Sequence, residues 1–104
     1  MNNIIPAEAQ DLIQKEGATV IDVRTPEEYA SGHIQGAINL NIQFSNFEDE
    51  LKRLDTQKCY IVNCQHGFRS SRASKRMKNL GFSNVNNLLG GLDAWRSYGL
   101  GVEV

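Results

Sequence analysis

The feature that most constrains this chain is a regular alternation of short β-branched runs with segments of helical periodicity. Strand-like runs separated by short helices favour a parallel sheet with helices on both of its faces, an α/β fold. We expect four strands in these apolar runs, at 19–23, 37–40, 59–63 and 84–88. A first strand is expected around Ile4 and Ile5, just before the first helical segment.

The helical segments carry recognisable start and stop signals. Pro6 begins the first segment and Gly17 ends it. Thr25 and Glu28 have the spacing of a capping box around a second, short helix that Gly32 ends. Apolar residues at helical spacing predict three more helices, within 43–55, 70–80 and 91–99. The apolar stripe of the first of these three is Phe44, Phe47, Leu51 and Leu54.

Length and composition are those of an ordinary globular domain. The 104 residues are enough for a single domain, 1–104, with a modest core. A net charge of -1 gives no reason to expect a nucleic-acid partner. No apolar run approaches the roughly 20 residues that cross a bilayer, and the first residues lack the segments of a secretory signal. We therefore expect a cytoplasmic protein with no membrane partner.

The two cysteines, Cys59 and Cys64, stand at the start and just after the end of one predicted strand. In extended chain they lie roughly 16 Å apart, which is too far for a disulfide or a shared metal ion. His33 and His66 complete no zinc pattern. The sequence therefore predicts two free thiols in a reducing compartment, and neither a metal nor another cofactor.

The stretch CQHGFRS, residues 64–70, joins the best central strand to a helix expected to begin at Ser70. In open α/β sheets, ligands bind beyond the carboxyl ends of the strands. Backbone N–H groups and a helix N-terminus there can hold an anion and lower the pKa of a cysteine, here Cys64. Gly67 suits a turn with unusual φ, and Ser70 can cap the helix and donate toward the thiolate. Arg69, a cation where the helix dipole disfavours one, indicates a shared anion.

Plainer interpretations exist for these residues. A lone cysteine beside a buried strand is more often a small apolar residue, and Cys59 keeps that interpretation. His66 either lines the entrance of the loop or is an ordinary surface histidine. Phe68 is either a rim residue or part of the packing of the loop. Gln65, His66 and Phe68 do not identify a substrate by themselves.

Three motifs in order resemble the rhodanese family. The stretch IDVRTPEEYASGHIQGAINL, residues 21–40, is similar to its first signature. The stretch GFSNVNNLLGGLDAW, residues 81–95, is similar to its second, and CQHGFRS between them looks like its active-site loop. The resemblance covers almost the whole chain and is to the single-domain members. It implies a rhodanese-like fold with a central five-stranded parallel sheet and helices on both faces.

The resemblance also implies an activity. In such a sulfurtransferase, Cys64 takes a sulfane sulfur from thiosulfate or a similar donor, becomes a persulfide, and passes the sulfur to cyanide or a thiol. The loop residues that would bind the substrate are Gln65, His66, Gly67, Phe68, Arg69 and Ser70. Arg69, helped by His66 when protonated, would hold an anionic donor. The partners implied are a small donor and acceptor, with a thiol protein such as thioredoxin as a further candidate, and the default assembly is a monomer.

Two other functions are compatible with a cysteine loop of this kind. Related dual-specificity phosphatases carry one residue more between cysteine and arginine, and the C-x4-R spacing from Cys64 to Arg69 favours sulfur over phosphate or arsenate chemistry. A persulfide carrier or regulatory module acting on a partner protein is the alternative, although such modules usually lack the cysteine.

Residues of the two flanking motifs are predicted to be scaffold. Asp22 and Arg24 end a strand near the loop, and Arg24 and Glu28, four residues apart, are expected to pair. His33 and Gly36 are expected to form a structural turn. The second motif is expected to pack the last helix through Gly90, Gly91, Ala94 and Trp95.

Overall fold

The computed structural model describes all of residues 1–104 and contains one five-stranded sheet. Its strands are β1 (Asn2–Ile4), β2 (Thr19–Asp22), β3 (Ile38–Asn39), β4 (Cys59–Asn63) and β5 (Asn84–Leu88). They lie in the order β1-β5-β4-β2-β3, and every pair is parallel. The predicted fold class is confirmed, with β4 at the centre of the sheet.

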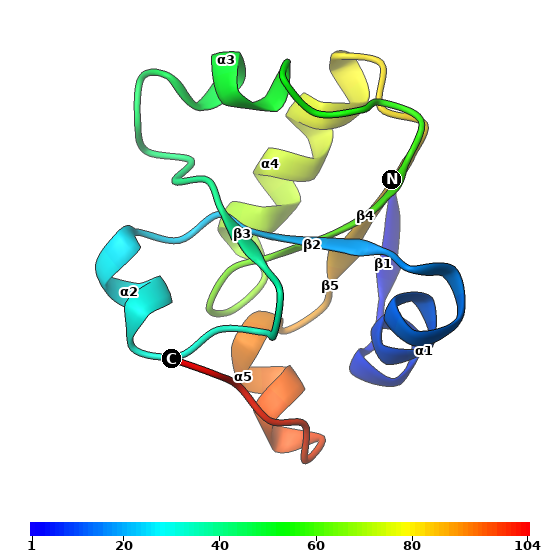
Figure 1. Cartoon of the computed structure of the whole chain (residues 1–104), viewed down its shortest axis with the longest axis vertical. Helices are drawn as coiled ribbons and strands as arrows, with labels where there is room; N and C mark the ends of the chain where they lie inside the picture. Colours follow the sequence, from blue (N-terminus) through cyan, green and yellow to red (C-terminus); the bar gives the residue numbers. More distant parts are fainter.

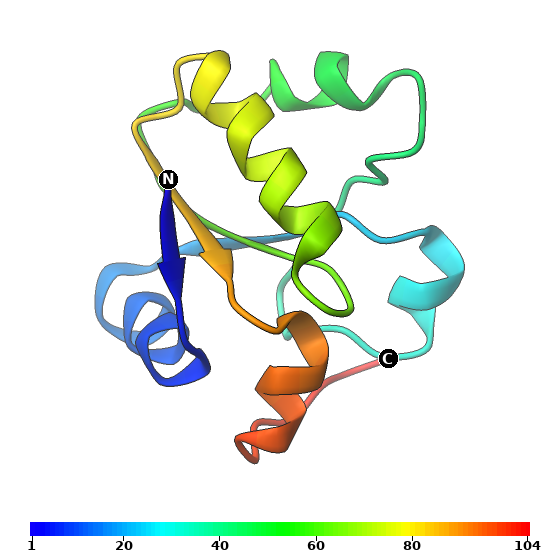
Figure 2. The same ribbon diagram turned by 180° about the vertical axis from the view of Figure 1, so that it is seen from behind.

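Helices cover both faces of this sheet (Figures 1 and 2). They are α1 (Pro6–Glu16), α2 (Pro26–Ala30), α3 (Phe47–Leu51), α4 (Phe68–Asn79) and α5 (Gly91–Ser97). One core lies under α3 and α4, where Phe47 and Met77 are almost fully buried. The other lies under α1 and α5, where Ala9 and Trp95 are buried. The site-bearing strand β4 is therefore enclosed on both sides.

Alternation along β4 supplies side chains to both cores. Tyr60 and Val62 belong to the core under α4, whereas Ile61 between them belongs to the core under α1. This is the period of two expected of a strand, and because both faces are covered it reads in the sequence as a continuous apolar run. The end of β4 is thereby fixed in place, together with the loop that follows it.

The local helix signals act much as the sequence predicts. Gly17 ends α1 in the left-handed conformation, with a φ of 65°. The Thr25 side chain accepts a hydrogen bond from the Glu28 N–H group, and the Glu28 carboxylate accepts one from the Thr25 N–H group. The capping box that starts α2 is therefore complete.

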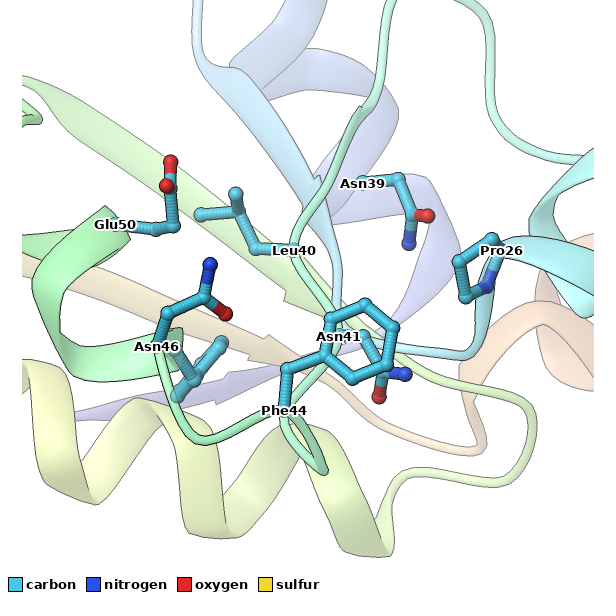
Figure 3. Close-up of a pocket in the computed structure, with 8 residues that line it drawn as sticks. Pro26, Asn39, Leu40, Asn41, Phe44, Asn46 and Glu50 are labelled. Carbon is cyan, nitrogen blue, oxygen red and sulfur yellow. The ribbon is translucent and has the colours of Figure 1, made fainter.

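The third helix is shorter than its apolar stripe predicts. Only Phe47 and Leu51 of that stripe are deeply buried, and Phe44 is 53% exposed. The chain before Asn46 forms turns, so Phe44 leaves the helical face and lines a pocket between α2, β3 and α3 (Figure 3). Three asparagines, Asn39, Asn41 and Asn46, line the same pocket. None of its lining residues belongs to the loop after β4.

The fourth helix begins two residues before the predicted start. Gly67 is its N-cap, with a φ of 104°, and Phe68 is its first residue. The prediction that Ser70 caps the helix is therefore wrong. The left-handed turn at Gly67 starts the helix earlier and places Ser70 inside its first turn, where it is buried.

Candidate active site

The loop from Cys64 to Gly67 leaves the carboxyl end of the central strand and turns directly into α4. In Figure 2 this loop lies beside the start of α5, which follows the neighbouring strand β5. The carboxyl ends of two adjacent parallel strands thus bring the two later sequence motifs together. This is the edge of an α/β sheet at which ligands bind.

The sulfur of Cys64 faces hydrogen-bond donors from the first turn of α4. The Gly67 N–H group donates to Sγ at 3.0 Å, and the Ser70 hydroxyl oxygen lies 3.4 Å from Sγ. Burial raises the pKa of Cys64, but hydrogen bonds from the Ser70 hydroxyl and from loop N–H groups outweigh it, and the net pKa lies below the usual value. The arrangement stabilises a thiolate.

The carbonyl groups of the loop point the other way, toward α5. The Leu92 N–H group donates to the Cys64 carbonyl at 2.9 Å, and the Asp93 N–H group donates to the Gln65 carbonyl at 3.2 Å. With its carbonyls held by α5, the loop is free to turn N–H groups toward the sulfur. The start of α5 therefore sets the orientation of the loop.

Gly91 makes this contact possible. A Cβ atom on Gly91 would lie 2.6 Å from the Cys64 carbonyl oxygen, which is far inside van der Waals contact. The sequence predicts for this glycine only that it packs the last helix. Its further role, close approach to the loop, depends on residues almost thirty positions away, so no local pattern could have revealed it.

Gln65 and His66 are both held by Asp93, a residue that sequence reasoning missed. The Gln65 side-chain amide donates to one carboxylate oxygen of Asp93, and His66 Nδ1 lies 2.8 Å from the other. The Gln65 side-chain oxygen Oε1 also accepts a hydrogen bond from the Arg24 guanidinium at 3.0 Å. Since the His66 side chain is 64% exposed, it lines the outer rim of the loop.

Phe68 is not packed against the loop. It is 79% exposed at the first position of α4, so its ring stands in solvent at the rim. Of the two interpretations left open by the sequence, the rim position is the one that the structure supports.

Arg69 does not stand free to receive an anion. Its two terminal nitrogens donate to the two carboxylate oxygens of Glu28, at 2.7 and 2.9 Å. This bidentate pair, against the cost of burial, lowers the pKa of Glu28 to about 2. The sequence predicts that Arg69 shares an anion, and in the structure the Glu28 carboxylate from α2 is that anion.

The predicted pairing of Arg24 with Glu28 is wrong. Arg24 is almost fully buried and lies 2.8 Å from the Asp22 carboxylate, while it also donates to the Gly32 carbonyl at 2.7 Å. Burial favours the partner on the strand over the one on the exposed helix. Asp22 holds Arg24 in place within the buried layer, and Arg24 reaches the loop through Gln65.

Nothing else in the structure adds a metal-binding group or a membrane segment to this site. No three or more His, Cys, Asp or Glu side chains are grouped so that they could hold a metal ion. The helices are all too short or too polar to cross a bilayer. Both cysteines are free, and burial raises the pKa of Cys59, the opposite direction to Cys64.

Fold and site together define a class of protein: a parallel α/β domain that presents an activated thiol in a loop of inward-facing donors. The family model for the rhodanese-like domain matches residues 5–98. The chain therefore belongs to the rhodanese family.

Named relatives and solved structures agree with this assignment. The chain is 38% identical over 101 residues to thiosulfate sulfurtransferase GlpE of Actinobacillus pleuropneumoniae, covering 96% of this chain and 91% of the relative. It is 37% identical over 94 residues to the protein of that name from Pseudomonas putida, covering 90% and 84%. A rhodanese-related protein from Thermoplasma volcanium superposes with a TM-score of 0.88 at 34% identity, covering 99% and 98% of the two chains.

Proposed function

We propose that this chain is a thiosulfate sulfurtransferase that carries the transferred sulfur on Cys64. The observation that carries the proposal is the cradle around Sγ, built from the Gly67 N–H group and the Ser70 hydroxyl. The named relatives support the choice of donor. In the same proposal, Gln65, His66, Gly67, Phe68, Arg69 and Ser70 form the substrate-binding loop.

The first half-reaction loads the cysteine. The Cys64 thiolate attacks the outer sulfur of thiosulfate, a sulfur–sulfur bond forms, and the bond from that sulfur to the sulfonate group breaks. Sulfite leaves with the electron pair of the broken bond. The donors around Sγ are preorganised for the negative charge that passes from the thiolate to the terminal sulfur of the persulfide.

The second half-reaction unloads it. Cyanide or a thiolate attacks the terminal sulfur of the persulfide, and the bond between the two sulfur atoms breaks. Its electron pair returns to Cys64 as the thiolate, while the acceptor leaves as thiocyanate or as a persulfide. No oxidant or reductant is consumed, so the chain needs no redox cofactor for this cycle.

Steady-state turnover with thiosulfate and cyanide tests the proposal. We expect thiocyanate to form with ping-pong kinetics, and the rate to fall to background in Cys64→Ser. Cys59→Ser is the matched control, because that thiol lies at the opposite end of β4 and should leave the rate near the native value. Absence of thiocyanate from the native chain, or full turnover in Cys64→Ser, would overturn the proposal.

We propose further that the acceptor in the cell is a thiol protein of the thioredoxin type and that the chain acts as a cytoplasmic monomer. Two free cysteines are compatible with the reducing compartment that such an acceptor requires. The alternative, a persulfide carrier for one partner protein, differs in acceptor range. A panel of cyanide, glutathione and thioredoxin separates the two, because a dedicated carrier should load normally but turn over poorly with small acceptors.

A further inference from the structure

Each basic side chain on the active-site loop, or hydrogen-bonded to it, lies against a carboxylate. The three pairs are Arg24 with Asp22, Arg69 with Glu28, and His66 with Asp93, at 2.8, 2.7 and 2.8 Å. Each carboxylate comes from an element other than the loop itself: β2, α2 or α5. The cradle for an anionic substrate is therefore made of neutral donors, and the two arginines near it are each paired with a carboxylate.

Of these three pairs, the one with Arg69 is the most informative. The Arg24 pair is buried scaffold, and the His66 pair is open to solvent, whereas the Arg69 and Glu28 side chains are only 22% and 33% exposed. Both terminal guanidinium nitrogens of Arg69 are used in the fork geometry that a carboxylate shares with sulfonate and phosphate groups. Glu28 thus occupies the place on Arg69 that an oxyanion would otherwise take.

The negative charge of Glu28 is not needed for the start of its own helix. A capping box requires only an oxygen that accepts from the N-cap N–H group, and glutamine supplies one as well as glutamate does. Here the Glu28 oxygen accepts from the Thr25 N–H group at 3.1 Å. The charge therefore serves Arg69, on a different helix and 41 residues away in the sequence.

We propose that Glu28 is a positioning residue that sets anion specificity by cancelling the charge of Arg69. With the guanidinium paired, the loop binds oxyanions only weakly, so that sulfite is released after each transfer and phosphate does not compete with thiosulfate. This inference rests on the proposed sulfurtransferase function and explains how such a site releases the oxyanions that it binds.

Binding of inorganic phosphate and of sulfite, measured by calorimetry, tests it. The measurements use the full chain in a Cys64→Ser background, so that no thiol chemistry intervenes. Glu28→Gln keeps the capping box and removes the charge, and we expect both anions to bind about tenfold more tightly. Glu27→Gln removes the same charge from the exposed neighbouring position, and its affinities should stay within about twofold of the parent. Unchanged affinity in Glu28→Gln would overturn the proposal.

A double variant separates charge cancellation from a merely structural role. Arg69→Gln alone leaves Glu28 unpaired and should weaken phosphate binding, the opposite direction to Glu28→Gln. The double variant Glu28→Gln/Arg69→Gln has the same net charge as the native pair, and its phosphate affinity should return to within a few-fold of the parent. If it binds phosphate as tightly as Glu28→Gln does, Arg69 is not the group that Glu28 restrains, and the proposal fails. The double variant also serves if Glu28→Gln alone does not fold.

The turnover assay measures KM and kcat separately, and the expected combination of changes is one that a structural defect would not produce. In the native Cys64 background, Glu28→Gln should lower KM for thiosulfate and increase inhibition by added sulfite, with kcat reduced because sulfite leaves more slowly. A rise in KM would contradict the proposal. Anion binding does not depend on sulfur transfer, so a native chain without turnover would overturn the proposed function while the phosphate measurement still judges Glu28.

Discussion

At the scale of single residues, the chemistry depends on how Cys64 is kept ionised in a buried place. Burial alone would raise the pKa of the thiol, as it does for Cys59. Cys64 differs because the loop and the first turn of α4 direct the Gly67 N–H group and the Ser70 hydroxyl at the sulfur. These hydrogen bonds favour the charged form more strongly than burial disfavours it.

Removing the hydroxyl of Ser70 should weaken this effect. In Ser70→Ala the pKa of Cys64 rises, so that less thiolate is present at neutral pH. Turnover at neutral pH should fall on the order of tenfold, the scale of one hydrogen bond to a charged group. The pH profile of alkylation by iodoacetamide checks the cause, because its midpoint should move upward.

Ser71→Ala is the matched control for that substitution, since Ser71 follows in the same helix and its side chain makes no hydrogen bond to Cys64. Its alkylation midpoint should coincide with that of the native chain. An unmoved midpoint in Ser70→Ala would show that the backbone donors alone hold the thiolate.

At the scale of elements, the site depends on helices that meet from different parts of the chain. The start of α5 holds the carbonyls of the loop, and α2 reaches α4 through the pair of Glu28 and Arg69. Arg69 lies near the start of α4, where the helix dipole disfavours a cation. The carboxylate from α2 offsets that cost, so the pair links two helices that are far apart in the sequence.

This pair predicts a specific pH dependence of stability. The folded-state pKa of Glu28 is lowered from 4.5 to about 2, so its contribution is fully present above pH 4.5 and is lost as the pH falls toward 2. Relative to Glu28→Gln, the native chain should be more stable by about 1–2 kcal/mol at neutral pH, allowing for solvent screening. Urea unfolding between neutral and acidic pH should show this difference shrinking toward zero.

Glu27, the exposed neighbour of Glu28, again supplies the control. Glu27→Gln should change the free energy of unfolding by only a few tenths of a kcal/mol over the same pH range. A difference between the native chain and Glu28→Gln that stays constant down to pH 2 would mean that the ion pair is not its source.

Many of the helix and strand signals were predictable from the sequence. The contacts between distant elements were not, for a physical reason. The strand run at 59–63, the capping box and the glycine stop of α1 are local signals, and the structure has them where the sequence places them. The partners of Glu28 and Gln65 were not predictable in this way. Arg69 is 41 residues from Glu28 and Asp93 is 28 residues from Gln65, so only the folded sheet brings them together.

At the scale of the whole molecule, one sheet separates two cores. Met77 lies in the core under α4, and Trp95, the only tryptophan, lies in the core under α1 and α5. Strand β4 contributes to both, so we expect that loss of one core also unfolds the other. A single domain over 1–104 is therefore the prediction, and the position of the active loop depends on both faces.

Substitution in one core should be detected in the other. Met77→Ala, at a fully buried position, should destabilise the chain by about 2–5 kcal/mol. Urea unfolding followed by Trp95 fluorescence should shift by the same amount as unfolding followed by circular dichroism, because two-state unfolding moves all probes together. A fluorescence transition that stays in place while the dichroism shifts would mean that the two faces unfold separately.

Sulfur transfer through Cys64 is tested most directly by the mass of the intact protein. After incubation with thiosulfate and removal of excess donor, we predict a gain of one sulfur atom that cyanide then removes. The added mass should appear in Cys59→Ser and be absent from Cys64→Ser. A native chain that gains no sulfur from thiosulfate, or a Cys64→Ser chain that still gains it, would contradict the account.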